Sequence, residues 1–483
     1  MTPILIIILL PLVTALICLA IKNWKVEYAI TLGSAIVHAA ISFGIFTGFL
    51  TPEKVFMFEL DALGRLFLLV LSNTYFWIVL VSYSYIKLPV ESDSTSGKRY
   101  YFMLMNFYLV ANTAAVMSNH FGMYWVAVEM TTLSVVPLVY YSRSDEALVA
   151  MWKYLFIVSV GIAFAFIGIL FLALSAKGTV LEGEQLYFTE YMKNAAELSP
   201  VWLKASFIFI FAGLSTKIGI APMHSGDIDA TSSAPSPIAA LFSGTLRITA
   251  LLGVLRIFRI MIPTDSFEFA KAVIIAGGLF SIFVTFIYMF KVTDYKKMVA
   301  YSSVEHLGII ALGIGTGGLA FIGALYHIVF NSMTKIGFFF CAGKIHLKYR
   351  SRNVSDITGV LDRIPWTGWI FLISFFAVSG IPPFGFFFSE LRIFEGVLFS
   401  ERPYLLILAM VFLIFIFINM GRTVFGMLYK KGPETFTGEK DPFNIFHFTS
   451  ISILVIMVLI AVSDPQVLAQ NIKDIANDFG MLP

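Results

Sequence analysis

The chain has 483 residues and a formal net charge of +3 at pH 7. Hydrophobic residues make up 58% of it and charged residues 13%, which is about half the charged share of a soluble domain. This composition excludes an ordinary soluble protein, and no basic run is dense enough to indicate binding of nucleic acid.

The apolar residues form runs that are each long enough to cross a bilayer as a helix, which takes about 20 residues. The runs are continuously apolar rather than alternating, so they favour helices over the strands of a barrel. We therefore predict an all-α integral membrane protein with about fourteen transmembrane helices. In chain order the runs are 2–21, 27–48, 62–86, 99–118, 120–141, 147–175, 201–221, 235–262, 270–291, 297–315, 317–343, 365–398, 403–428 and 444–465.

The first run lacks a basic start and is followed by Lys22 and Lys25, so we expect a retained helix rather than a cleaved signal peptide. With the N-terminus outside, the cytoplasmic loops would hold 17 of the 33 Lys and Arg, the other loops 10 and the helices 6. This excess predicts that both termini lie outside. Arg256 and Arg259 count against that orientation.

The two cysteines, Cys18 and Cys341, lie within apolar runs and have no partner at a motif spacing. They predict no disulfide framework and no zinc or iron–sulfur site. We therefore expect the chain to carry no cofactor of its own.

Two predicted helices are interrupted by glycine and proline beside a charge. The seventh contains Ser215–Pro222, which includes Lys217, and the twelfth contains Ser379–Gly385 and continues to Glu390. Proline cannot continue a straight helix, and the carbonyls that it frees are tolerated in a membrane only against protein or water. Such interrupted helices are typical of ion and substrate sites in transporters.

The interrupted helices are five helices apart, so we expect helices 4–8 and 9–13 to be two five-helix repeats. An odd number of spans in each repeat would place the two copies in opposite orientations. No residue-level repeat supports this division, and two ordinary proline kinks are the alternative. The expected parts are 1–98, 99–262, 270–428 and 429–483.

Charged side chains within spanning helices are costly to insert, which makes them functional candidates. Glu129, Lys217 and Glu390 have no short route to water. Lys153 and Lys335 could instead extend to the membrane surface. The candidate ion-translocation residues are Glu129, Lys153, Lys217, Arg247, Glu305, His327, Lys335 and Glu390.

Two of these candidates have structural alternatives. Glu305 could pair with the adjacent His306, and His327 could ligate a haem together with His38. Helices that bind b-type haem usually offer two well-placed histidine pairs, which this sequence does not, so we do not predict a haem.

Several segments between about 120 and 390 resemble one family of membrane proteins. They are Trp152–Tyr154, Ala234–Pro237, Ala300–Glu305 and Lys335–Lys348. The chain resembles the antiporter-like proteins shared by respiratory complex I, Mrp-type sodium/proton antiporters and membrane-bound hydrogenases. The last two segments look most like the component F branch of hydrogenase-4.

The resemblance implies that Glu129 pairs with Lys217, and that His327 and Glu390 belong to the same conducting chain. It further implies lateral translocation of protons or sodium ions in a prokaryotic cell membrane. This translocation would be driven by redox chemistry in another subunit of the same complex. The implied partners are lipid, other membrane subunits including further antiporter-like ones, and a peripheral arm with iron–sulfur or nickel–iron subunits.

Three positions depart from the pattern of this family. Asn331 stands where relatives have a histidine, and Ser225–Thr231 replaces a loop that usually contains tryptophan and proline. Arg247 stands one residue before the position often held by lysine. A guanidinium keeps its proton at any relevant pH, so we expect Arg247 to hold a carboxylate ionised or to bias Lys217 towards losing its proton.

Two other functions remain open from the sequence. The chain could belong to an independent Mrp-type antiporter, or it could be an inactive scaffold descended from a pump. The altered segment Ser225–Thr231 favours the scaffold, while Glu129, Lys217 and Glu390 argue against it.

Overall fold

The computed structural model describes residues 2–87, 95–183, 185–430 and 441–482. Within those ranges the chain is helical, with isolated β-bridges only, and twelve helices are long and apolar enough to cross a membrane. They are α1 (Pro3–Ala20), α2 (Trp24–Phe46), α3 (Ala62–Lys87), α5 (Phe121–Val139) with the turn η1 (Tyr140–Ser142), α6 (Asp145–Ser175), α8 (Pro200–Ile218), the rod of α10 (Ser236–Leu241), the π-helical turn η3 (Phe242–Leu246) and α11 (Arg247–Met261), α12 (Phe267–Met289), α13 (Tyr295–Thr316), α14 (Gly318–Tyr349), α18 (Tyr404–Tyr429) and α19 (Ile445–Ser463).

The predicted all-α membrane fold is confirmed, but the count of fourteen spans is not. Helix α4 (Thr95–Met117) coincides with the predicted run 99–118, and the run 365–398 is divided between α16 (Pro365–Val378) and α17 (Gly385–Leu398). The remaining short elements are α7 (Phe188–Lys193), η2 (Ala195–Glu197), α9 (Ser225–Ser233), η4 (Val354–Asp356), α15 (Val360–Arg363) and α20 (Gln466–Asp478).

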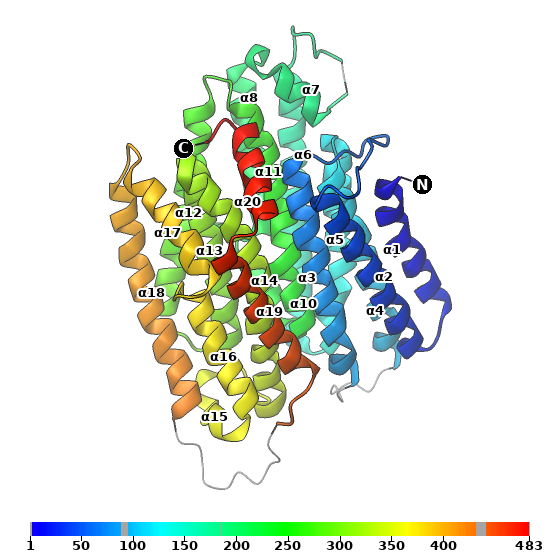
Figure 1. Ribbon diagram of the computed structural model, residues 1–483, viewed down its shortest axis with the longest axis vertical. Coiled ribbons are helices and arrows are strands. Elements are labelled where there is room, and N and C mark those ends of the chain that lie inside the picture. The colour runs from blue at the N-terminus through cyan, green and yellow to red at the C-terminus, as the bar shows by residue number, and fades with distance from the viewer. Residues whose placement is uncertain (1, 88–94, 184, 431–440, 483) are drawn as a thin grey trace.

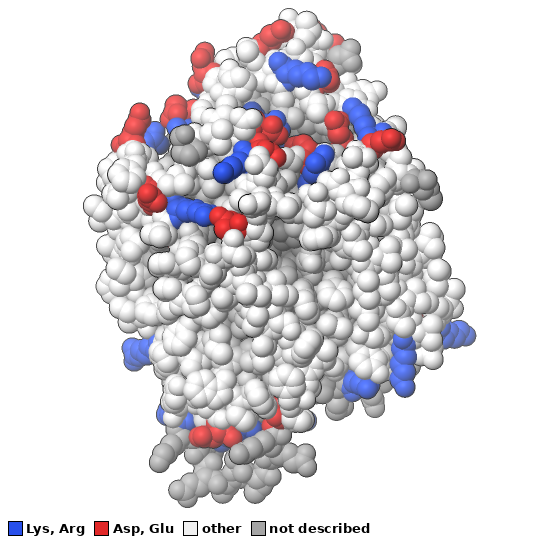
Figure 2. Space-filling model, in the orientation of Figure 1, with Lys and Arg blue, Asp and Glu red and all other residues white. Residues whose placement is uncertain are grey.

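The long helices stand side by side, and Figure 1 places α7, the start of α1 and the end of α20 towards one end of the bundle and α15 at the other. In Figure 2 the charged residues gather towards the two ends and leave a broad uncharged band below the upper group. Such a band is what a bilayer requires of a spanning protein. Of the basic residues counted for the orientation, Lys431 and Lys440 lie outside the described residues.

The two arginines that count against the predicted orientation are both paired. Arg256 binds Asp61, with one contact of 2.7 Å, and Arg259 lies 3.4 Å from the same carboxylate. Arg259 also lies 3.5 Å from Asp478 of α20. Burial acts to raise the pKa of Asp61, but the two guanidinium groups hold that pKa below its usual value. These arginines therefore serve as internal anchors, so they are weak evidence about which side of the membrane they face.

The two interrupted helices have the same local structure. Helix α8 ends at Gly219, with φ of +86°, and α16 is followed by Gly380, with φ of +66°. Glycine is the residue that adopts this left-handed backbone without steric cost. Each begins a Gly-Ile-X-Pro sequence, at 219–222 and 380–383, before the next helix starts. The breaks thus share a four-residue pattern with a left-handed glycine at its start, a correspondence not recognised from the sequence alone.

Candidate functional site: a buried row of charges

Lys217 lies at the first break, because the left-handed Gly219 ends α8 and Pro222 prevents the helix from continuing. Its side chain is fully buried and donates to the Val128 carbonyl and to Thr131 Oγ1, the latter at 2.6 Å. Both partners lie on α5. The ammonium group is therefore held by neutral oxygens rather than by a direct ion pair.

Glu129 lies on the same turn of α5, close enough to act electrostatically on Lys217. Its carboxylate accepts hydrogen bonds from Ser159 at 3.3 Å and Thr132 at 3.4 Å, and its side chain is only partly buried. The structure thus brings together the two residues that the family resemblance pairs, with Glu129 nearer the surface of the bundle.

Arg247 follows the π-helical turn η3 and is fully buried. Its Nη2 lies 2.5 Å from Asp227 Oδ2, and Asp227, on α9, is also fully buried. The two clearest departures from the family pattern, Arg247 and the segment that contains Asp227, are therefore partners. Asp227 is the neighbouring carboxylate that the sequence analysis expected without identifying it.

Lys335 is fully buried on α14, so it does not extend to the membrane surface. Its Nζ donates to Ser302 Oγ on α13 at 2.5 Å. Glu305, about one turn further along α13, lies within electrostatic reach of this ammonium group. Glu305 is therefore placed to pair with Lys335 rather than only with its neighbour His306.

A histidine pair connects this lysine region to the second break. His306 Nδ1 lies 3.1 Å from His327 Nε2 and 3.7 Å from Glu390 Oε1. Ser389 Oγ lies 2.9 Å from the other nitrogen of His327. Glu390 and Glu305 both line a cavity of about 50 Å³ next to α18. The sequence offers His306 only as a possible structural partner of the adjacent Glu305. That adjacency is the single sequence feature that could have indicated a place for His306 in the row.

The same three side chains could in principle hold a metal ion, since His306, His327 and Glu390 offer ligand atoms within 4.8 Å of one another. In this arrangement the two histidines are already hydrogen-bonded to each other. His38 is engaged elsewhere, by Thr113 at 3.0 Å and Ser72 at 2.9 Å. The geometry therefore gives no support to a haem shared by His38 and His327.

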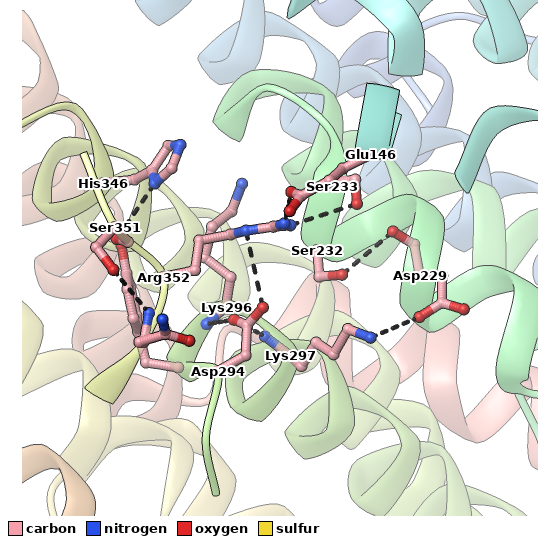
Figure 3. Close-up of polar contacts among 12 residues, drawn as sticks. Glu146, Asp229, Ser232, Ser233, Asp294, Lys296, Lys297, His346, Ser351 and Arg352 are labelled. Carbon is pink, nitrogen blue, oxygen red and sulfur yellow. Dashed lines mark hydrogen bonds and ion pairs between the residues drawn. The ribbon is translucent and has the colours of Figure 1, made fainter. Parts of the chain in front are cut away.

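Lys153 does not lie in the buried row. Its side chain is 43% exposed and pairs with Asp229 of α9, which also binds Lys297 at 2.9 Å. Figure 3 shows Asp229 facing Lys297, close to a second group in which Arg352 faces Asp294 and Ser233. Lys153 thus belongs to a polar cluster that fastens the outer side of α9.

Each break places a carboxylate against its left-handed glycine. A Cβ on Gly219 would lie 3.0 Å from Asp227 Oδ2, and a Cβ on Gly380 would lie 2.4 Å from Glu390 Oε2. Both positions therefore require glycine for their positive φ. Gly380 is also required because a Cβ there would occupy the space that the Glu390 carboxylate fills.

Comparison with known sequences gives one family and several relatives. The family described as NADH:quinone oxidoreductase/Mrp antiporter, transmembrane, matches residues 118–417. A hydrogenase-4 component F homolog of Methylacidiphilum infernorum is 33% identical over 410 residues, which is 83% of this chain and 84% of the relative. NADH-quinone oxidoreductase subunit N of Herminiimonas arsenicoxydans is 26% identical over 64% of each chain.

Two solved structures share the fold. A chain of the archaeal membrane-bound sulfane sulfur reductase superposes with a TM-score of 0.86 at 19% identity, over 99% of this chain and 97% of that one. A chain of the Mrp complex from Dietzia sp. superposes with a TM-score of 0.85 at 16% identity, over 99% and 98%. At these identities the agreement shows the architecture alone.

The glycine contacts lead to a graded prediction. We expect Gly380→Ala to destabilise the protein by about 1–2 kcal/mol from its left-handed backbone, and further because its Cβ would displace Glu390. Gly219→Ala should be milder locally, since its Cβ would meet Asp227 at 3.0 Å. Thermal unfolding of the purified variants measures both effects.

Gly426 of α18 is the matched control, because a Cβ there meets nothing within 4 Å. Gly426→Ala should leave stability unchanged or slightly increased. Equal stabilities for all three variants would contradict the role given to the two breaks.

Proposed function

The chain belongs to the NADH:quinone oxidoreductase/Mrp antiporter transmembrane family, and from this premise we propose that its buried row of charges translocates ions. The observation that carries the proposal is the succession of ionisable groups between the two breaks. In order these are Glu129, Lys217, the Asp227–Arg247 pair, Lys335 with Glu305, the His306–His327 pair, and Glu390.

The chemistry of these groups suits proton transfer. In a desolvated site a lysine loses its proton more readily and a glutamic acid keeps it, while a nearby opposite charge reverses both tendencies. Making and breaking the contacts of Lys217 with Glu129, and of Lys335 with Glu305, would therefore move protons between neighbours. Arg247 cannot take part as a carrier and acts as a fixed charge.

The ends of the row differ from its middle. Glu129 is partly exposed on α5, and Glu390 is 15% exposed beside the cavity at α18. Figure 1 places α5 and α17 towards opposite sides of the bundle. A row that crosses the interior between α5 and α17 suits lateral conduction between subunits that lie side by side in the membrane.

We also propose the division into inverted repeats, 99–262 and 270–428, flanked by 1–98 and 429–483. The matching Gly-Ile-X-Pro sequences at 219–222 and 380–383 support it, as does a carboxylate packed against each glycine. The two breaks would then be equivalent positions in the two halves.

The chain is an antiporter-like subunit whose relatives belong to multi-subunit membrane complexes. We propose that its own complex is a membrane-bound hydrogenase or a related ferredoxin-linked oxidoreductase, with a peripheral iron–sulfur arm. The 33% identity to a hydrogenase-4 component F homolog favours this over an independent Mrp-type antiporter. An inactive scaffold is disfavoured, since the altered segment supplies a partner for Arg247.

We expect Lys217→Ala and Glu129→Gln to leave the complex assembled and electron transfer largely intact, because the proposal assigns redox chemistry to another subunit and only ion translocation to these residues. Ion translocation in vesicles should fall by about tenfold or more, as expected when a positioned proton-transfer group is lost.

Lys204→Ala is a matched control for Lys217→Ala. Lys204 lies near the start of α8, the helix that also carries Lys217, and packs over the ring of Phe269. It should translocate ions normally. Normal translocation by the Lys217 and Glu129 variants would show that these residues are structural and that the proposed function is wrong.

Copurification distinguishes the two kinds of complex. An affinity-tagged chain extracted in mild detergent should bring iron–sulfur or nickel–iron subunits with it, together with other antiporter-like subunits. Recovery of membrane subunits alone, with sodium/proton exchange in vesicles, would instead identify an Mrp-type antiporter.

We propose that the chain lies in a prokaryotic cell membrane, as the family resemblance implies. We further propose that both termini lie outside, because Lys and Arg are in excess in the loops that would then face the cytoplasm. Single cysteines introduced at Gln185 and Arg350 test this orientation in intact cells, because the native Cys18 and Cys341 are buried. An impermeant thiol reagent should label position 185 and spare position 350, and the reverse pattern would overturn the orientation.

A further inference from the structure

The Asp227–Arg247 pair lies between the two buried lysines. On one side it contacts the break at Gly219, where a Cβ would lie 3.0 Å from Asp227 Oδ2 and 3.7 Å from Arg247 Nε. Lys217 is two residues before this glycine. On the other side the π-helical turn that ends at Arg247 packs on α14 and α13: a Cβ on Gly244 would lie 2.9 Å from the Ser332 carbonyl, and Ser243 Oγ lies 3.2 Å from Ser303 Oγ, next to the Ser302 that binds Lys335. A charge at this position therefore acts on the centre of the row.

Stability alone does not account for such a pair. Both side chains are fully buried, and a buried ion pair typically stabilises a protein no better than apolar side chains of the same size. Among the described residues, Asp227 Oδ1 and Arg247 Nε and Nη1 have no hydrogen-bond partner, so the pair does not use its full bonding capacity. The ion pair is therefore weak evidence for a purely stabilising role.

The positive charge of Arg247 is permanent, because a guanidinium does not lose its proton in a protein. Without a counter-charge it would repel a proton on Lys335 in surroundings that screen charge poorly. The carboxylate 2.5 Å away is Asp227, and Thr231 of the same helix adds a hydroxyl at 3.4 Å. Asp227 is thus the group placed to cancel this charge.

We propose that Asp227 is a positioning residue whose carboxylate neutralises Arg247 and thereby keeps Lys335 able to bind and release protons in the working pH range. The proposal rests on the function proposed above. It deepens that function by assigning opposite electrostatic effects to two residues that do not themselves carry the ion.

The comparison of the two breaks supports this assignment. Asp227 and Glu390 both pack against the left-handed glycine of their own break. Glu390 faces His306 at 3.7 Å and a cavity, whereas Asp227 faces a guanidinium and is fully enclosed. The two carboxylates thus have different surroundings: Glu390 lies beside a histidine and a cavity, and Asp227 lies beside a fixed positive charge.

The helix that carries Asp227 is fixed from its other side. Asp229, two residues later, binds Lys153 of α6 and Lys297 of α13 near the surface. These contacts tie α9 to both neighbouring helices while Asp227 points inwards. The carboxylate is therefore presented to Arg247 by a segment that is anchored independently of the pair.

The pH profile of ion translocation also depends on other ionisable groups close to the Asp227–Arg247 pair and to the two lysines. Those that face the pair or the two lysines are Tyr154 on α6, Glu129 on α5, Lys217 on α8, Glu305 and His306 on α13, His327 and Lys335 on α14, and Glu390 on α17. None of them is altered in the variants below, so each variant shares this background with the native protein.

The test compares Asp227→Asn, Arg247→Gln and the double variant in the assembled complex. Asp227→Asn leaves an unpaired cation, so the pH profile of ion translocation should shift to lower pH by about one unit, as a neighbouring charge typically causes. Arg247→Gln removes the cation, and the buried carboxyl left without a partner takes up a proton, so the profile should not shift to lower pH. The double variant removes both charges and should return towards the native profile.

The pair formed by Arg256 and Asp61 is the control, because it lies on the same helix α11 but outside the row. Arg256→Gln with Asp61→Asn should leave the pH profile in place. If a single variant at 227 or 247 does not assemble, the neutral double variant still tests the proposal, since a profile displaced from the native one would contradict it.

Three results would overturn the proposal: shifts in the same direction, a uniform loss of activity without a shift, or a double variant worse than both single ones. Each would mean that the pair only supports the structure. Failure of the proposed function looks different, because Lys217→Ala would then translocate ions normally.

Discussion

The cost of placing charge in a poorly screening interior is the constraint on which this structure depends. A membrane-spanning bundle can hold a buried lysine, arginine or glutamate only if oxygen atoms, nitrogen atoms or an opposite charge replace the lost water. Each member of the row obeys this rule differently: Lys217 through a carbonyl and a hydroxyl, Arg247 through Asp227, and Lys335 through a serine and a nearby glutamate.

Much of this arrangement could be predicted from the sequence, because membrane insertion leaves a strong pattern. The apolar runs located the helices, and proline beside a charge located both breaks. The family resemblance predicted that Glu129 lies near Lys217. The resemblance itself is confirmed by a relative at 33% identity. The exact number of spans was harder, since a helix interrupted at Ser379–Phe384 counts as one run in the sequence and as two helices in space.

The partner of Arg247 could not be predicted, for a geometric reason. A π-helical turn at 242–246 precedes this arginine, and it changes the 3.6-residue periodicity from which a side chain's direction is inferred. Asp227 was visible only as part of an unusual segment, with nothing to show that it pointed inwards. For Lys153 the sequence left two positions open, the buried row and the membrane surface, and the structure places it near the surface in contact with Asp229.

The network at Asp61 has a consequence for how the chain is made. Asp61 precedes Arg256 by 195 residues and Arg259 by 198 residues. The other partner of Arg259, Asp478, follows this arginine by 219 residues. During synthesis Asp61 is therefore made before both arginines, and Asp478 of α20 is made after them. The charges of α11 have a partner available as soon as this helix is made, whereas the contact of Arg259 with α20 has to wait for a later segment.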